Sequence, residues 1–321
     1  MTAPNLTEIV TTTLRNRSGI LADNVTNNNA LLRKLKEKGA IKKLSGGRTI
    51  VRELDYAENG TYKEYSGYET LDVSASEVLS AAEYEWKQSA VCVTISGLEQ
   101  RQNSGPEAII NLLEGRINNA QRTMANQTSV GIYSAGTANS GKQIGGLQLI
   151  VADTNTNTVG GIDASLSANA FWRNVVFDAS SAGSAASAGN IISYMNTVFN
   201  QLVRGTDQPD LIVADFNYFG HYQNALQTQQ RFTSDKSAGA GFVNLMYMGG
   251  VEVVLDGGSG IPTNHMYFLN TDYLFWEVHK DAYMTPLEGM RPTNQDAMVF
   301  PIILQSNLTC SNRKLQGVLK A

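Results

Sequence analysis

The first eighty residues carry too few apolar positions to build a core of their own. Residues 1–37 are polar except for a narrow stripe formed by Leu31, Leu32 and Leu35, and this pattern predicts a helical arm. Residues 38–80 change to short alternating runs typical of strands. We expect both segments to lie on other protein surface, because neither can bury enough apolar area alone.

Turn signals divide the second segment. Strands are predicted at 41–44, 49–54 and 61–65, with Gly46-Gly47 and Asn59-Gly60 between them. Asn-Gly is a strong hairpin signal. We therefore predict a long, exposed two-stranded hairpin. An isolated hairpin is marginal in water, so we expect it to pack on another subunit.

A long helix follows two more predicted strands, at 82–88 and 91–95. Ser104 and Glu107 form a capping box, and Pro106 suits the first turn. Apolar residues then recur at helical spacing, which predicts a helix over about 104–133, about 40 Å long. The members of this apolar face are Ile109, Leu113, Ile117, Ala120 and Met124.

Strand and helix patterns interleave from residue 147 onward, which is typical of an α+β or α/β lobe. A strand is predicted at 147–151 after a Gly/Ser/Ala-rich linker at 136–146. The later elements are predicted helices at 191–203 and 217–230 and predicted strands at 210–215, 251–256, 266–269, 298–304 and 308–318.

The composition is that of an ordinary globular protein with room for two lobes. The chain has 321 residues, of which 42% are hydrophobic and 17% charged. No signal peptide and no apolar stretch long enough to cross a bilayer is evident, so we expect folding in the cytoplasm. Cys92 and Cys310 form no spacing motif, and we expect two reduced, buried thiols.

Charge is distributed unevenly along the chain. Residues 1–52 hold ten Lys/Arg and three acids, a net charge of +7, whereas the whole chain carries −4 and the remainder therefore −11. A basic arm on an acidic body fits an anionic partner or a neighbouring copy of the same protein. A solvated helix face would explain the same charges and stays open.

Catalytic and cofactor motifs are incomplete. Residues 136–143 nearly match the phosphate-binding loop G-x-x-x-x-G-K-[ST], but Gln143 replaces the hydroxyl that would hold Mg²⁺, and a strand is predicted to follow. The three histidines have no metal-ligand spacing. Asp215 and His221 could be imagined as a hydrolytic pair, but a helix-capping role suits Asp215 better. We expect no cofactor and no metal.

The order of elements resembles the Hong Kong 97-like fold of tailed-phage major capsid proteins. Local resemblances occur at 82–88, at 160–163 with 171–174, and at 269–274. The resemblance implies an α+β fold divided as follows: 1–37 N-terminal arm, 38–80 E-loop, 81–146 peripheral domain with its spine helix, 147–277 axial domain, and 278–321 closing strands of the peripheral domain.

The resemblance also implies a function. It implies a structural, non-enzymatic subunit that assembles into hexamers and pentamers of an icosahedral phage head around double-stranded DNA. Implied partners are further copies, non-specifically bound DNA, and separate scaffolding, portal and decoration proteins, with assembly in the host cytoplasm and a final location in the virion. Alternatives are an encapsulin-like compartment, a fibrous tail or surface protein, and a hydrolase using Asp215 and His221.

Assembly contacts are expected on the hairpin and on the N-terminal arm. Tyrosines offer amphipathic contact area, and Lys63 is a conceivable donor for a covalent cross-link. The expected contact residues are Tyr56, Asn59, Gly60, Tyr62, Lys63, Tyr65 and Tyr68 on the hairpin, and Arg33, Lys34 and Lys36 on the N-terminal arm.

Overall fold

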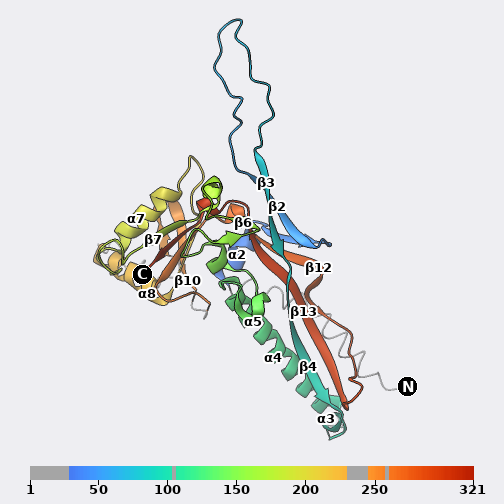
Figure 1. Cartoon of the computed structure of the whole chain (residues 1–321). Coiled ribbons are helices and arrows are strands. Elements are labelled where there is room, and N and C mark those ends of the chain that lie inside the picture. The colour runs from blue at the N-terminus through green and yellow to red at the C-terminus, as the bar shows by residue number, and fades with distance from the viewer. Residues whose placement is uncertain (1–28, 103–105, 230–244, 257–259) are drawn as a thin grey trace.

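The computed structural model describes residues 29–102, 106–229, 245–256 and 260–321. It has an elongated lobe, a broader second lobe and a thin loop that stands out from their junction (Figure 1). Residues 1–28 of the expected N-terminal arm and the predicted capping residue Ser104 lie outside the described residues.

A four-stranded sheet with the order β1-β12-β13-β4 forms the elongated lobe. Its strands are β1 (Ile41–Leu44), β12 (Leu274–Pro286), β13 (Ala297–Cys310) and β4 (Lys87–Ser96). Strand β13 pairs antiparallel with both β12 and β4, while β1 runs parallel to β12 at one edge. The short helix α3 (Gly97–Gln102) lies at the far tip (Figure 1).

The long helix is confirmed as α4 (Pro106–Ile132), which packs along β4. Ile117, Ala120 and Met124, which the helical spacing selected, are all buried. They join one apolar core with Trp276 and Phe300 of the sheet. The 27 residues of α4 give it a length of about 40 Å, enough to run along much of the lobe.

Helix α2 (Ala30–Glu37) corrects one expectation about the N-terminal arm. Leu31, Leu32 and Leu35 are fully buried in the same core as Trp276. Asn29 caps the helix by accepting a hydrogen bond from the backbone N–H of Leu32. This part of the arm therefore packs on its own chain and not on another copy.

A six-stranded mixed sheet with the order β7-β14-β11-β8-β10-β9 forms the second lobe. Its strands are β7 (Val175–Asp178), β8 (Leu211–Ala214), β9 (Leu245–Tyr247), β10 (Val251–Leu255), β11 (His265–Leu269) and β14 (Gly317–Lys320). Helices α7 (Ile191–Leu202) and α8 (Phe216–Gln229) pack together and against this sheet. The predicted helices at 191–203 and 217–230 are thus confirmed.

Strand β8 contributes side chains to two apolar cores. All four of its residues are buried. Leu211 and Val213 contribute to the core shared with the elongated lobe, whereas Ile212 and Ala214 contribute to the core under α7 and α8. Alternation along the strand sends successive side chains to opposite faces, so the sheet separates two apolar layers.

Short elements complete the described chain. They are α5 (Ala138–Gly141), α6 (Leu147–Ile150), β5 (Thr158–Val159), β6 (Ile162–Asp163), and the 3₁₀ turns η1 (Ser167–Trp172), η2 (Met248–Gly250), η3 (Thr271–Tyr273) and η4 (Arg313–Leu315). The strand predicted at 147–151 is wrong, because α6 occupies it. An apolar run this short does not distinguish a buried strand from a buried helical turn.

The last strand corrects a second expectation. The resemblance implied that all of 278–321 belongs to the first lobe, but β14 joins the sheet of the second lobe between β7 and β11. The chain thus crosses between the two sheets at Asn270–Tyr273 and again at Ser311–Gln316. Gln316 fastens the crossings, since its side chain accepts a hydrogen bond from the Asn270 N–H and donates one to the Asn270 carbonyl, both 3.0 Å.

Candidate assembly surfaces

The protruding loop grows from a two-stranded root. Strand β2 (Thr49–Asp55) pairs antiparallel with β3 (Leu79–Glu85). Ile50 and Leu54 of β2 and Ala82 and Tyr84 of β3 are buried, while the residues between them are more exposed. The alternation follows from the period of two in a strand and fixes which face lies on the body.

Two short elements clamp this root. The β5–β6 turn contacts β3 closely, because the carbonyl of Gly160 accepts a hydrogen bond of 2.9 Å from the Glu83 N–H. Gly160 has φ +60°, and a Cβ there would lie 2.8 Å from the Cβ of Ala82. Trp172 of η1 is buried beneath and donates to the Val159 carbonyl at 2.9 Å. Glycine at 160 is thus required by both conformation and space.

Arg52 ties the root to the elongated sheet. Its guanidinium forms an ion pair with Glu277 of β12, whose side chain is 1% exposed. The same guanidinium lies 4.0 Å from the ring centroid of Phe275. A buried carboxylate needs such a partner, since an unpaired buried charge is strongly destabilising.

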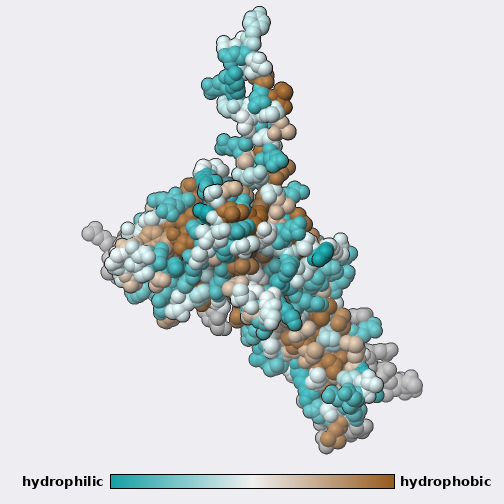
Figure 2. Space-filling model, viewed as in Figure 1, coloured by the Kyte–Doolittle hydropathy of each residue, from teal (hydrophilic) through white to brown (hydrophobic). Residues whose placement is uncertain are grey.

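Residues 56–78, here called the distal loop, extend beyond the root without regular strands. The strand predicted at 61–65 is therefore wrong. The Asn59-Gly60 signal does mark a turn, in which the Tyr62 N–H donates to the Asn59 carbonyl at 3.3 Å, but this turn joins no paired strands. The strand that pairs with β2 begins only at Leu79. Figure 2 shows the distal loop standing clear of the body, with apolar and polar positions intermixed along it.

The expected contact residues fall into two groups on this loop. Tyr62, Tyr65 and Tyr68 are 82%, 61% and 108% exposed. Tyr56 instead packs at the base, with its ring centroid 4.9 Å from that of Phe171. Three exposed tyrosines leave a contact surface that the described residues of this chain do not cover.

Asn59, Gly60 and Lys63 have local interactions. The Asn59 side chain accepts hydrogen bonds from the Thr61 N–H and hydroxyl at 3.0 and 2.8 Å, and the Gly60 N–H donates to Ser76 Oγ at 3.4 Å. Lys63 pairs with Glu69 at 3.0 Å, both about half exposed. A pair this exposed stabilises little. The cross-linking role of Lys63 stays a prediction.

The hairpin carries a charge that the sequence analysis missed. Residues 53–85 contain nine acids and one base, Lys63, so their net charge is −8, and the rest of the chain is +4. The net charge of −11 for residues 53–321 did not show that most of the negative charge lies in this segment. Counting charge over the hairpin would have found it. The acids are Glu53, Asp55, Glu58, Glu64, Glu69, Asp72, Glu77, Glu83 and Glu85.

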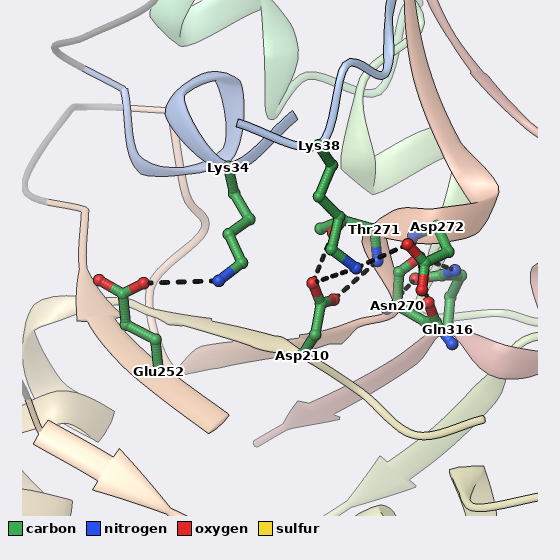
Figure 3. A network of polar contacts seen from close by, with 8 residues as sticks. All are labelled: Lys34, Lys38, Asp210, Glu252, Asn270, Thr271, Asp272 and Gln316. Atoms are coloured by element: carbon green, nitrogen blue, oxygen red, sulfur yellow. Dashed lines mark hydrogen bonds and ion pairs between the residues drawn. The ribbon is translucent and has the colours of Figure 1, made fainter. Parts of the chain in front are cut away.

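Two basic residues of α2 face Glu252 of the second lobe, and Figure 3 shows the pair between Lys34 and Glu252. Arg33 and Lys34 lie 3.0 and 3.9 Å from the carboxylate oxygens of Glu252 on β10. Lys36 also has a partner within the chain. Arg33 and Lys34 therefore fasten α2 to the second lobe. The expected role of Arg33, Lys34 and Lys36 between subunits stays a prediction.

Lys38, directly after α2, adds two ion pairs near the point where the chain passes from one lobe to the other. Its ammonium lies 2.9 Å from Asp210 and 2.7 Å from Asp272 (Figure 3). Burial by itself would lower the pKa of Lys38, but its hydrogen bonds to Asp272 and Asp210 raise that pKa above its ordinary value. Asp210 also accepts from the Thr271 N–H and hydroxyl at 2.8 and 2.6 Å. The carboxylate is thus held by groups from two segments, one after α2 and one at the start of η3.

Asp215 caps helix α8, as expected. One carboxylate oxygen accepts from the Tyr218 N–H at 2.9 Å and the other from the Asn264 N–H at 2.7 Å. His221 lies further along the same helix, with its ring near that of Tyr218. Both oxygens of Asp215 are occupied by backbone donors, which gives this carboxylate a structural role.

The near-match to a phosphate loop has a different geometry from a phosphate cradle. Residues 138–141 form α5, and the carbonyl of Gly141 accepts a hydrogen bond of 2.7 Å from Lys87. Within the described ranges, no group of three or more metal-ligating side chains is found, and no helix is long and apolar enough to span a bilayer. Cys92 and Cys310 are free thiols; Cys310 is buried as expected, whereas Cys92 is exposed, so the expectation of a buried thiol is wrong there.

Comparisons with solved structures identify the fold. The capsid asymmetric unit of cyanophage A-1(L) matches with a TM-score of 0.63 at 15% identity, covering 88% of this chain and 90% of that one. The mature capsid of bacteriophage PhiM1 matches with a TM-score of 0.55 at 13% identity, covering 88% and 86%. The chain has the Hong Kong 97-like capsid fold.

An encapsulin shares this fold. The encapsulin of the holo-SrpI complex from Synechococcus elongatus PCC 7942 matches with a TM-score of 0.54 at 9% identity, covering 90% of this chain and 86% of that one. No protein-family model matches the sequence, and no curated protein sequence is detectably similar. The likeness therefore lies in the backbone.

Proposed function

We propose that this protein is the structural subunit of an icosahedral phage head, assembling into hexamers and pentamers around double-stranded DNA. The distal loop carries the proposal: its exposed tyrosines have no covering surface within the described chain. The capsid-like fold supports it, because nearly the whole chain aligns with capsid subunits.

The distal loop has the reach to contact a neighbour. Each side of the loop spans about eleven residues, and an extended chain advances at most about 3.3–3.6 Å per residue. It could thus extend about 35 Å beyond its root. Ordering so exposed a segment costs conformational entropy, and contact with a second copy would offset that cost.

A closed shell needs ring-forming contacts between identical subunits and further contacts that join the rings. The elongated lobe with its hairpin supplies a long perimeter for such contacts, and the second lobe would meet its equivalents at the ring centre. Shell strength is then the sum of many modest interfaces. Scaffolding, portal and decoration proteins would bind the assembled lattice during formation of the virion in the host cytoplasm.

Electron microscopy of the purified full chain tests this function. We expect closed shells by negative stain and a large assembly by light scattering. Replacing residues 58–76 with a short Gly-Ser turn should leave a folded subunit that forms no closed shells. The double variant Ser66→Ala/Thr70→Ala is the matched control, since it keeps the loop with its tyrosines and charges and should assemble. A wild-type chain that stays monomeric, or normal shells from the shortened loop, would refute the proposal.

The encapsulin-like compartment is the second candidate, because the SrpI shell matches about as well as PhiM1. The two differ in what they enclose. Nuclease-protected double-stranded DNA in particles purified from an infected host favours the phage head. Particles that co-purify with a protein cargo and no protected DNA favour the compartment.

A further inference from the structure

The charge of the side chains changes from positive to negative within β2, where the hairpin begins. Residues 38–52 contain five bases and no acid, whereas the next 33 residues contain nine acids and one base. Two of the five bases already have partners in the chain: Lys38 binds Asp210 and Asp272, and Arg52 binds Glu277. The remaining three are the exposed residues Lys42, Lys43 and Arg48, here called the basic edge.

The basic edge lies on and beside β1, an outer strand of the four-stranded sheet. Among the described residues, β1 pairs only with β12, so no described strand satisfies the backbone groups along its other edge. The Lys43 ammonium lies 5.8 Å from the ring centroid of Tyr283, and Lys43 remains exposed at the edge of the sheet. Lys280 and Asp281, which follow the β1-paired part of β12, cancel each other's charge.

We propose that the basic edge of one copy is the seat for the acidic distal loop of a second copy. This rests on the proposed function, since it specifies where the loop binds in the shell. The loop's own basic edge is out of reach, because Arg48 directly precedes β2 and the loop extends away from that root (Figure 1). A second copy is therefore the source of the loop.

The groove at the opposite edge of the same sheet offers no unpaired cation among the residues that line it. This groove of about 560 Å³ runs between β4 and α4. Its one lining cation, Arg116, already binds Glu99 at 2.6 Å. An acidic loop would gain no unpaired positive charge there, whereas three exposed cations await it at the β1 edge.

Edge lysines have another known use, which is to prevent edge-to-edge pairing of sheets. Charge reversal separates the two roles. Glutamates at the basic edge would still block strand pairing, but they would repel an acidic loop. Lysines on the loop would then restore attraction to the reversed edge.

The test compares three full-length variants in shell assembly. The edge variant is Lys42→Glu/Lys43→Glu/Arg48→Glu, and the loop variant is Glu58→Lys/Glu64→Lys/Glu77→Lys. The swap variant combines all six changes and has the wild-type net charge. The control, Arg122→Glu/Lys142→Glu/Arg291→Glu, reverses three exposed cations elsewhere. Circular dichroism and thermal unfolding verify folding, and the single changes Lys42→Glu and Glu64→Lys replace any triple variant that does not fold.

We expect at least tenfold fewer shells from the edge and loop variants, and shell yield restored to at least half of wild type in the swap variant. Wild-type assembly should also weaken as salt rises, because exposed charges are screened. Wild-type yield from either triple variant, or no recovery in the swap variant, would refute the basic edge as the binding site of the loop while leaving the proposed shell function intact. A wild-type chain that forms no shells would instead overturn the proposed function itself.

Discussion

Replacing Leu32 with alanine tests whether α2 belongs to its own subunit. Leu32 is fully buried on a helix of eight residues, between Leu31 and Leu35 in the same core. Truncating a buried leucine to alanine costs about 2–5 kcal/mol, through lost burial and the cavity left behind. A helix this short has little stability without packing, so we expect a cost toward the upper end of that range.

Urea unfolding of the dissociated subunit, followed by tryptophan fluorescence, measures the effect. Trp276 reports on this core, because α2 contacts β12 directly. The free energy of unfolding should fall by the stated amount at every protein concentration. Leu71→Ala on the distal loop, where the side chain is 49% exposed, is the control and should change stability by less than about 0.5 kcal/mol.

Two results would refute this reasoning. A change below about 0.5 kcal/mol for Leu32→Ala would mean that α2 contributes nothing to the core of the free subunit. A cost that emerges only at concentrations where subunits associate would mean that α2 packs on a neighbouring copy. Either result would restore the expectation that this part of the N-terminal arm clasps another subunit.

Two further predictions concern the hairpin clamp and a titrating pair. Gly160→Ala should lower stability by about 2–4 kcal/mol in thermal or urea unfolding, because a left-handed backbone and a close contact with Ala82 both oppose the new methyl group. Gly161→Ala, at φ +76° with open space around it, should cost only about 1–2 kcal/mol, and equal costs would contradict the contact. Burial by itself would lower the pKa of His265, but its hydrogen bond to Asp153 raises that pKa above 6.5, and the same hydrogen bond lowers the pKa of Asp153. The pair therefore stabilises the fold between the two folded-state pKa values, an effect lost as pH rises through that of His265 or falls through that of Asp153. Since Asp153 is 46% exposed, Asp153→Asn should cost less than about 1 kcal/mol near pH 6 and nothing near pH 9, and a pH-independent cost would contradict the ion pair.

The sequence predicted elements whose signals are local. Helix α4 follows from apolar spacing that repeats over many turns, and the capping role of Asp215 follows from a carboxylate placed between a buried strand and a helix. Both features depend on residues within a few positions of one another. Such interactions are visible in a single sequence because the chain brings the partners together without help from the fold.

Pairings between distant segments could not be predicted in this way. Strand β1 pairs with β12, more than 200 residues later, and no local pattern in 41–44 names that partner. The Asn59-Gly60 signal was misleading because β2 pairs with a strand beginning at Leu79, so the intervening loop is long rather than tight. The stripe Leu31, Leu32 and Leu35 showed that α2 must pack on something, but did not show on what.

The place of β14 sets a limit on when this protein can fold during synthesis. The strand lies inside the six-stranded sheet, hydrogen-bonded to β7 on one side and β11 on the other. At about 5–20 residues per second, a ribosome needs roughly 7–28 s to proceed from β7 to β14. Through that interval β7 has no strand to pair with in the sheet, so the nascent chain lacks a finished second lobe. A chain built in this order cannot complete its second lobe while residues 317–320 are still being translated, and an affinity tag placed directly after β14 would be attached to the strand that completes the fold.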